Sequence, residues 1–410
     1  MGIIVFFLNN IRLILFGFFT AFFSSFGQTF FIALSSADIR STYSLSHGDF
    51  GLLYSTATLT SASLLIWAGR KIDNVDLKLY TTIVCFGLSL ACLGMANVNH
   101  VFWLFPVIFG LRFMGQGLLG HISSVSMARF FNRNRGKALS LATLGYPLGE
   151  AIFPSLTVAL IASFGWRQMW AWLGIALLIF LVPLMLWLLK GHKLKKSEFE
   201  DTSNLKKDLN SVSWTRARVL RDKRFYILLP SFLASSFIGT GFFFHQVHLT
   251  EIKSWNLEVF VGFFVIYAIT QMLSAMATGL LVDRYTAKYI MRFYLIPAIV
   301  GLSFIAVFDS QWAGAVFMAL FGITSGAVGI IHGAIWAETY GVANLGAIKA
   351  MCTSLMVLST ALSPPIMGIA FDYGISIENV AIASSVYMCI SAILVKLAFP
   401  ELKGNVIKKV

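Results

Sequence analysis

Charged residues are scarce in this sequence. Asp, Glu, Lys and Arg make up 12% of its 410 residues, whereas hydrophobic residues make up 58%. Soluble domains carry roughly 25% charged residues. The composition therefore excludes an ordinary water-soluble protein and indicates a chain that lipid solvates. The mean hydropathy of +0.79 agrees with this interpretation.

Several motifs of ATP-driven and catalytic proteins are missing. The sequence has no Gly-x-x-x-x-Gly-Lys-Ser/Thr loop, so we expect no drive by ATP. It also lacks His-Glu-x-x-His, Gly-x-Ser-x-Gly and His-x-x-x-x-Asp, which argues against a membrane protease or acyltransferase. No zinc-ligand spacing occurs, and the four cysteines lie in apolar stretches, as small core residues do. We therefore expect no enzyme activity, no cofactor and no metal.

Long apolar runs dominate what is present. A membrane-spanning helix needs about 20 mainly apolar residues, and only helices or closed barrels satisfy their backbone in lipid. Because runs of this length exclude barrel strands, we expect an all-α polytopic membrane protein with twelve spans. They are predicted at residues 11–34, 50–68, 79–97, 101–130, 138–163, 167–189, 225–249, 258–281, 290–308, 312–337, 347–371 and 379–399.

The net charge of +13 is concentrated in alternate loops. Cytoplasmic loops carry an excess of Lys and Arg, and the even-numbered predicted loops hold most of these residues. This pattern explains the basic charge without nucleic-acid binding. It predicts that both termini are cytoplasmic in a cell membrane, of the bacterial inner-membrane type.

The two halves of the chain repeat one another at an offset of 210 or 211 residues. Matching pairs are Ser24 and Ser235, Thr29 and Thr240, Gly69 and Gly279, Asp73 and Asp283, Gly115 and Gly326, His121 and His332, and Pro154 and Pro364. Repeats of this kind build transporter halves around a site near the bilayer midplane. We predict a six-helix bundle over 1–189, a cytoplasmic linker over 190–224, and a six-helix bundle with a short tail over 225–410.

Two short loops carry a resemblance to a known family. After span eight, Gly279, Leu281, Asp283, Arg284 and Lys288 match the inner-loop signature Gly-x-Leu-Ala-Asp-Arg-x-Gly-Arg-Arg of the major facilitator superfamily. After span two, Gly69, Asp73 and Lys78 keep part of it, and Arg112 followed by Gly115-Gln116-Gly117 is similar to the family's Arg-x-x-x-Gly element. The resemblance covers the whole chain and implies a transporter that works by alternating access. It gives the inner-loop residues Gly69, Asp73, Gly279, Asp283 and Arg284 a gating role, with a simple helix cap as the alternative.

Two charged residues lie deep inside predicted spans. Arg112 is about mid-way along span four, and Glu150 about mid-way along span five. Such residues cost roughly 2.5–3.5 kcal/mol at a helix centre, face the bundle interior and usually find a partner. We expect them to approach each other, directly or through water, and to couple proton and substrate binding. A static salt bridge is the alternative.

Histidines suit proton handling because they titrate near neutral pH. His121 and His332 occupy matching positions in spans four and ten, so the repeat predicts equivalent surroundings. Nine residues separate Arg112 from His121, which is 180° around an α-helix, so we expect the two to face opposite sides. His245 lies near the outer end of span seven, where a vestibule and an interfacial belt are both open interpretations.

Uncharged polar residues mark further candidate cavity faces. Tyr267 and Gln271 lie one turn apart in span eight, Gln28 follows Ser24 in span one, and Gln116 follows Arg112 in span four. Interhelical packing is the alternative for each. Tyr146 and Glu150 replace two glycines of the Gly-Pro-x-x-Gly-Gly element of related drug:proton antiporters, which argues against that activity.

The sequence thus predicts a secondary active transporter for a small organic solute, with protons as coupling ions and an organic anion as candidate substrate. Proton-driven efflux of lipophilic compounds is the alternative. We expect the lipid bilayer, protons and a small-molecule substrate as partners, no nucleic acid, and a functional monomer.

Overall fold

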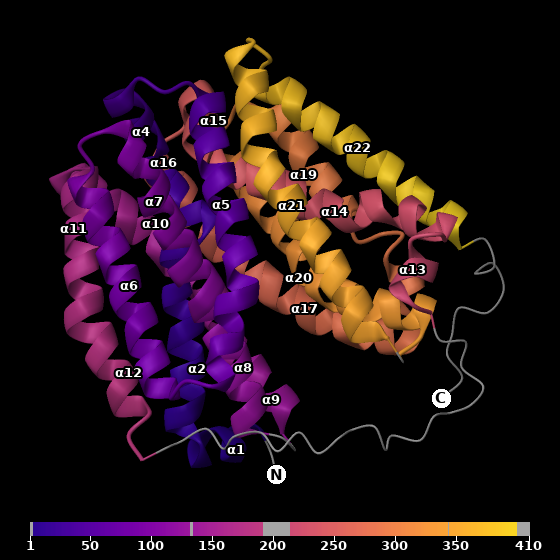
Figure 1. Ribbon diagram of the computed structural model, residues 1–410. Helices are drawn as coiled ribbons and strands as arrows, with labels where there is room; N and C mark the ends of the chain where they lie inside the picture. Colours follow the sequence, from indigo (N-terminus) through magenta and orange to yellow (C-terminus); the bar gives the residue numbers. More distant parts are fainter. Residues whose placement is uncertain (1–2, 132–133, 192–213, 343, 400–410) are drawn as a thin grey trace. The chain divides into compact units, whose positions relative to one another are not determined.

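A computed structural model describes residues 3–131, 134–191, 214–342 and 344–399. All regular elements of these segments are helices. The chain divides into two compact units, unit 1 over Met1–Thr202 and unit 2 over Ser203–Val410. Figure 1 shows unit 1 in indigo to magenta and unit 2 in rose to yellow.

Unit 1 contains the helices of the first half. They are α1 (Ile3–Asn9), α2 (Ile11–Phe23), η1 (Ser24–Gly27), α3 (Thr29–Ile32), η2 (Ala33–Ser35), α4 (Ser36–Tyr43), α5 (His47–Arg70), η3 (Lys71–Asp73), α6 (Leu77–Asn97), η4 (Val101–Trp103), α7 (Leu104–Gly110), η5 (Leu111–Leu119), α8 (Gly120–Phe130), α9 (Arg135–Thr143), α10 (Gly145–Phe164), α11 (Trp166–Ala176), η6 (Leu177–Leu181) and α12 (Val182–Leu188).

Unit 2 contains fewer and longer helices. They are α13 (Arg216–Val219), α14 (Lys223–Phe244), α15 (Gln246–Ile252), α16 (Leu257–Gly262), α17 (Phe264–Tyr285), α18 (Ala287–Ile290), α19 (Ile296–Val307), α20 (Trp312–Tyr340), α21 (Leu345–Asp372) and α22 (Ile377–Ala398).

The described part of the structure contains all of the predicted spans except the ninth. Ten helices among the described residues are long and apolar enough to cross a membrane, and the bent pair Ile11–Gly27 and Thr29–Tyr43 supplies an eleventh. The ninth predicted span, 290–308, was expected to be a full helix. It is regular only over Ile296–Val307, because turns occupy 291–295 and Pro297 stands in the first turn of α19.

Most of the predicted linker, 190–224, lies outside the described residues, as does the tail from residue 400. The described end of the linker holds α13, which begins with an N-cap from Thr215. Hydroxyl and carboxylate caps of this kind satisfy the unpaired N–H groups of a first helical turn. Ser46 with Asp49 caps α5, and Asp76 caps α6.

The first span is broken near its middle. Gln28 has extended backbone angles, φ −79° and ψ 153°, between η1 and α3. The two parts of the span meet at 44°. The repeat-equivalent residues of span seven lie inside the uninterrupted helix α14. Broken helices inside the membrane are a recurring feature of transporter binding sites.

Span four is unusual as well, because η5 is a π-helix of nine residues. Such segments are rare and are frequent at functional sites, although span six also holds one, η6. Gly115 in η5 lies directly against Gly27 at the break, and a Cβ on Gly115 would be 2.8 Å from the Gly27 Cα. The absence of side chains at both positions therefore permits the close approach of spans one and four.

Unit 2 is held together by a close helix pair and by a buried cation. Gly322 and Gly326 of α20 are spaced by four residues and lie against the backbone of α17, as small residues do where membrane helices approach closely. The Lys253 side chain, only 2% exposed, donates to Asp309 at 2.6 Å and pairs with Glu378 at 2.8 Å. Together they join three separate turns of the unit.

Candidate functional site

A buried arginine organises the centre of unit 1. Arg112, in the first turn of η5, is 6% exposed. Its Nη1 donates to the Gly27 carbonyl at 2.9 Å, and its Nε donates to Thr58 Oγ1 at 3.1 Å. A longer contact of 3.5 Å joins Nη1 to Thr29 Oγ1. The guanidinium also lies over the Tyr54 ring, 5.1 Å from its centroid.

The break in span one creates the main acceptor for this arginine. A regular helix would engage the Gly27 carbonyl within the span, whereas the extended residue Gln28 leaves it available to Arg112. Thr29, just past the break, shares a 2.7 Å hydrogen bond with the Tyr54 hydroxyl. Span one and span two thus hold the guanidinium in one orientation.

All of these partners are uncharged. None of the three ion pairs formed by described residues involves Arg112, and its Nη2 donates to no described residue. A buried cation without a counter-ion is costly. Among the described residues, Nη2 is therefore the guanidinium nitrogen of Arg112 without an acceptor.

Glu150 is the second charged residue at mid-span in unit 1. It lies in α10, and its Oε2 is fully buried with no hydrogen-bond partner among the described residues. The neighbouring Gly149 packs against Ser25 of η1. An ionised carboxylate without a donor is expensive to bury, and protonation removes that cost.

The expected direct pair of Arg112 and Glu150 does not form. The segment η1 contacts both η5 and α10, and the backbone at the break supplies the acceptor that Glu150 was expected to supply. Equal depth along two consecutive spans was therefore insufficient evidence for a direct ion pair, since η1 contacts the elements that carry both side chains and supplies the acceptor for Arg112.

The expectation that Arg112 and His121 face opposite sides is also wrong. Arg112 bonds to Thr58 and His121 to Gly69, and both of these residues belong to span two. The eleven residues between Thr58 and Gly69 are about three α-helical turns, so they share a face. The π-helix between the two side chains has more residues per turn, which removes the 180° offset.

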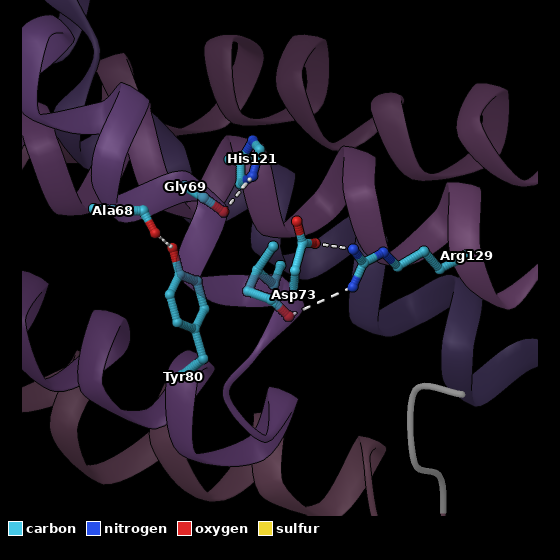
Figure 2. Close-up of polar contacts among 7 residues, drawn as sticks. Ala68, Gly69, Asp73, Tyr80, His121 and Arg129 are labelled. Carbon is cyan, nitrogen blue, oxygen red and sulfur yellow. Dashed lines mark hydrogen bonds and ion pairs between the residues drawn. The ribbon is translucent and has the colours of Figure 1, made fainter. Parts of the chain in front are cut away.

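Three side chains hold the loop that follows span two, as Figure 2 shows. His121 Nε2 donates to the Gly69 carbonyl at 3.1 Å, and Tyr80 donates to the Ala68 carbonyl at 3.0 Å. Arg129 bonds to Asp73 and lies 3.5 Å from the Ile72 carbonyl. The last carbonyls of a helix have no intrahelical partner, so spans three and four cap the end of span two.

The equivalent loop of unit 2 is held by an acidic side chain, whereas the basic Arg129 holds the loop of unit 1. Glu338 of α20 accepts from the N–H groups of Ala287 and Lys288 at 3.0 and 3.2 Å. Asp283 is exposed and forms no hydrogen bond or ion pair with another described residue, and Arg284 lies 5.1 Å from the Tyr285 ring centroid. A Cβ on Gly279 would meet nothing within 4 Å, so no close approach requires this glycine.

The surroundings of the two repeat-related histidines differ, contrary to expectation. His332 is stacked on Phe232 with ring centroids 4.0 Å apart, and its buried Nε2 has no partner among the described residues. His121 instead makes the polar contact with Gly69. His245, 4% exposed, donates to the Pro364 carbonyl at 3.0 Å and so packs span seven against span eleven.

The remaining candidates fall into both units. Gln116 lies in η5, one turn after Arg112, and Gln28 lies at the break, directly after the Gly27 whose carbonyl accepts from Arg112. Tyr146 packs on span four, where a Cβ at Gly120 would be 3.0 Å from its hydroxyl. In unit 2, Gln271 donates to the Tyr267 hydroxyl at 3.3 Å, so these two form a pair of their own.

Sequence reasoning missed the residues that hold Arg112. Tyr54 and Thr58 are polar, one turn apart in an apolar span, and that spacing was the available signal. The repeat adds a contrast. The residues 210 or 211 positions beyond Gly27, Tyr54, Thr58 and Arg112 are Ile238, Phe264, Ala268 and Ile323. The polar cluster of unit 1 thus has an apolar counterpart in unit 2.

Comparison with known proteins gives consistent results. The family model described as Major Facilitator Superfamily matches residues 17–264. Among solved structures, a bacterial homologue of the human lysosomal transporter Spinster, inward-facing and occupied, has 14% identity and a TM-score of 0.68, covering 96% of each chain. The nucleoside transporter NupG has 16% identity and a TM-score of 0.68, covering 97% of this chain and 99% of its own. No curated protein matches. At these identities the structures establish the fold alone.

Proposed function

Because the chain belongs to the Major Facilitator Superfamily, whose members are secondary transporters, we propose that it moves a small organic anion across the membrane together with protons. The observation that carries this proposal is the buried Arg112. Neutral oxygens hold its Nε and Nη1, while Nη2 has no partner among the described residues. A carboxylate or similar acid would supply the missing negative charge, since arginine donates well to such groups.

Glu150 supplies the proton-binding group of the proposal. In the proposed empty carrier, water that enters as the site opens solvates Glu150 and lets it ionise, so that a positive Arg112 and a negative Glu150 sum to zero. With the anion bound and Glu150 protonated, the sum is again zero. Either ligand alone leaves an uncompensated charge in a low-dielectric region, where such charges are costly. Coupling then follows from charge balance and requires no direct contact between the two side chains.

The basic loops support an orientation with both termini on the cytoplasmic side, because Lys and Arg favour cytoplasmic loops. A bacterial-type cell membrane and a functional monomer complete the proposal. The caps on Gly69, Asp73 and Ala287 would stabilise one arrangement of the inner loops and so contribute to gating.

Transport by the purified protein in proteoliposomes tests the proposal. Organic acids, amino acids, sugars and lipophilic cations are offered with and without an imposed pH gradient. We expect concentrative uptake of an organic acid that requires the gradient. Arg112→Gln should abolish uptake, and Glu150→Gln should keep counterflow exchange while losing concentration against a gradient.

Arg167→Gln is the matched control. Arg167 also donates to the backbone, through the Ala96 carbonyl at 3.2 Å, but lies in the first turn of α11, at the end of its span. Its loss should leave the substrate profile and the pH dependence unchanged. Full pH-driven accumulation by Glu150→Gln would refute the coupling role, and uptake restricted to lipophilic cations would refute the anion.

A further inference from the structure

A dense basic surface precedes the first span of unit 2. We define the basic rim as residues 214–226, which include α13 and the start of α14. Its exposed basic residues are Arg216, Arg218, Arg221, Lys223 and Arg224. Asp222 is the one acidic residue of the rim, so these positions contribute a net charge of +4.

The charge of the rim is not neutralised within the described residues. None of the five basic side chains takes part in the three ion pairs of these residues. The Asp222 carboxylate is engaged as the N-cap of α14, where it accepts from the Arg224 N–H at 3.0 Å. Arg218 lies over the Trp214 ring at 4.3 Å from its centroid, which orients the guanidinium without cancelling its charge.

The rim is also fixed in place on unit 2. Val219 is fully buried, and α13 contacts α21. Asn344 donates to the Trp214 carbonyl at 3.0 Å, and the Tyr226 hydroxyl donates to the Leu220 carbonyl at 3.0 Å. The arginines are therefore presented from an ordered support and do not belong to a free tether.

Apolar groups accompany these charges at the membrane end of the rim. Leu220 is 45% exposed and Tyr226 is 53% exposed, and the candidate span begins at Lys223. A short segment with arginines, an aromatic residue and an exposed leucine at a span end matches the chemistry of a membrane interface. Basic clusters just outside a span attract anionic lipid headgroups.

We propose that the basic rim binds anionic phospholipid headgroups of the adjacent leaflet. Charge complementarity carries the proposal, because the rim holds five cations without ion-pair partners beside exposed apolar groups. The binding is independent of the transported solute, so it stands or falls separately from the proposed function. Its assignment to the cytoplasmic leaflet alone depends on the proposed orientation.

Native mass spectrometry of the purified full-length protein tests this directly. The protein is titrated with phosphatidylglycerol or phosphatidylcholine, and the bound lipids are counted. We expect preferential retention of phosphatidylglycerol. Each basic residue near an anionic surface contributes roughly a fivefold gain in affinity, so Arg216→Gln with Arg218→Gln and Arg221→Gln should weaken phosphatidylglycerol binding about a hundredfold.

The control replaces three exposed basic residues elsewhere, as Arg70→Gln, Lys71→Gln and Arg284→Gln, with the same change in net charge. It should lose far less phosphatidylglycerol than the rim variant. Equal losses in the two variants, equal binding of both lipids to the unmodified protein, or full displacement of the lipid by soluble glycerophosphate would each overturn the proposal. An unchanged melting temperature in neutral detergent confirms that both variants fold.

Discussion

Replacing Arg112 by methionine separates a functional arginine from a structural one. Methionine keeps the length and apolar stem of the side chain and removes the guanidinium. If Arg112 serves to bind an anion, the protein should remain folded and lose its ligand. If the guanidinium is a structural element of unit 1, the protein should lose stability.

The contacts of Arg112 give the expected magnitude. Removing a cation from the centre of a span recovers about 2.5–3.5 kcal/mol on insertion scales. Against this, the Gly27 carbonyl loses its donor, at about 1–3 kcal/mol, and the contact with the Tyr54 ring is lost, at about 0.5–2 kcal/mol. Thr58 can turn its hydroxyl to a carbonyl of its own helix. The net change should therefore stay within about 2 kcal/mol of zero.

A broken buried ion pair would behave differently, because removal of one partner costs about 3–5 kcal/mol. Thermal unfolding of the purified variant in detergent measures the difference, and the stabilising shift produced by an organic acid measures binding. We expect a nearly unchanged melting temperature and no ligand-induced shift. A strongly lowered melting temperature, or a retained ligand shift, would refute the reasoning.

Three further predictions concern packing, capping and pH. Gly326→Ala should destabilise the protein by about 1–3 kcal/mol, because the added Cβ would overlap the backbone of α17. Gly279→Ala should be neutral or stabilise the protein by up to about 1 kcal/mol. Equal melting temperatures of the two variants would contradict the prediction. His121→Ala should cost about 1–3 kcal/mol by leaving the Gly69 carbonyl without its donor, and His121→Gln should restore most of the loss if a donor is what matters. Burial lowers the pKa of Lys253, but its two carboxylate partners raise it more, so its pKa lies above the ordinary value. The stabilisation of the folded protein by these ion pairs should therefore persist below about pH 10.4 and disappear above it as the ammonium deprotonates. Lys253→Met should remove this alkaline loss of stability in melting curves.

Most of the scaffold could be predicted from the sequence, because apolar length and repeated motifs are local properties of the chain. Eleven of the twelve predicted spans, counting the bent first one, and the family follow from them. The ninth span was overestimated, because hydropathy does not show that turns occupy 291–295 before Pro297. The loop residue Asp73 was found from its motif, but its partner Arg129 was not, since the two are joined only by the folded structure.

The centre of unit 1 was predicted in part. The cost of a buried charge pointed to Arg112 and Glu150, because that cost depends on residue type and depth alone. Their surroundings depend on two departures from the regular helix, the extended Gln28 and the π-helix η5. Arguments from 3.6 residues per turn fail at such positions. They failed for the Arg112–His121 relation for this reason.

The contrast between the repeats is the reason why we propose the substrate and proton chemistry in unit 1 alone. An arginine at Ile323 would lack equivalents of the Gly27 carbonyl and of the Tyr54 and Thr58 hydroxyls, because Ile238 lies in unbroken helix and Phe264 and Ala268 have no hydroxyl. Holding Arg112 thus required a coordinated set of differences: a broken span, two hydroxyl-bearing residues and a widened helix. Independent loss of any one would leave a buried cation less well bonded, at a cost of about 1–3 kcal/mol. Such interdependence is expected where several residues maintain one binding group, and it supports our proposal that the Arg112 cluster acts as a single unit.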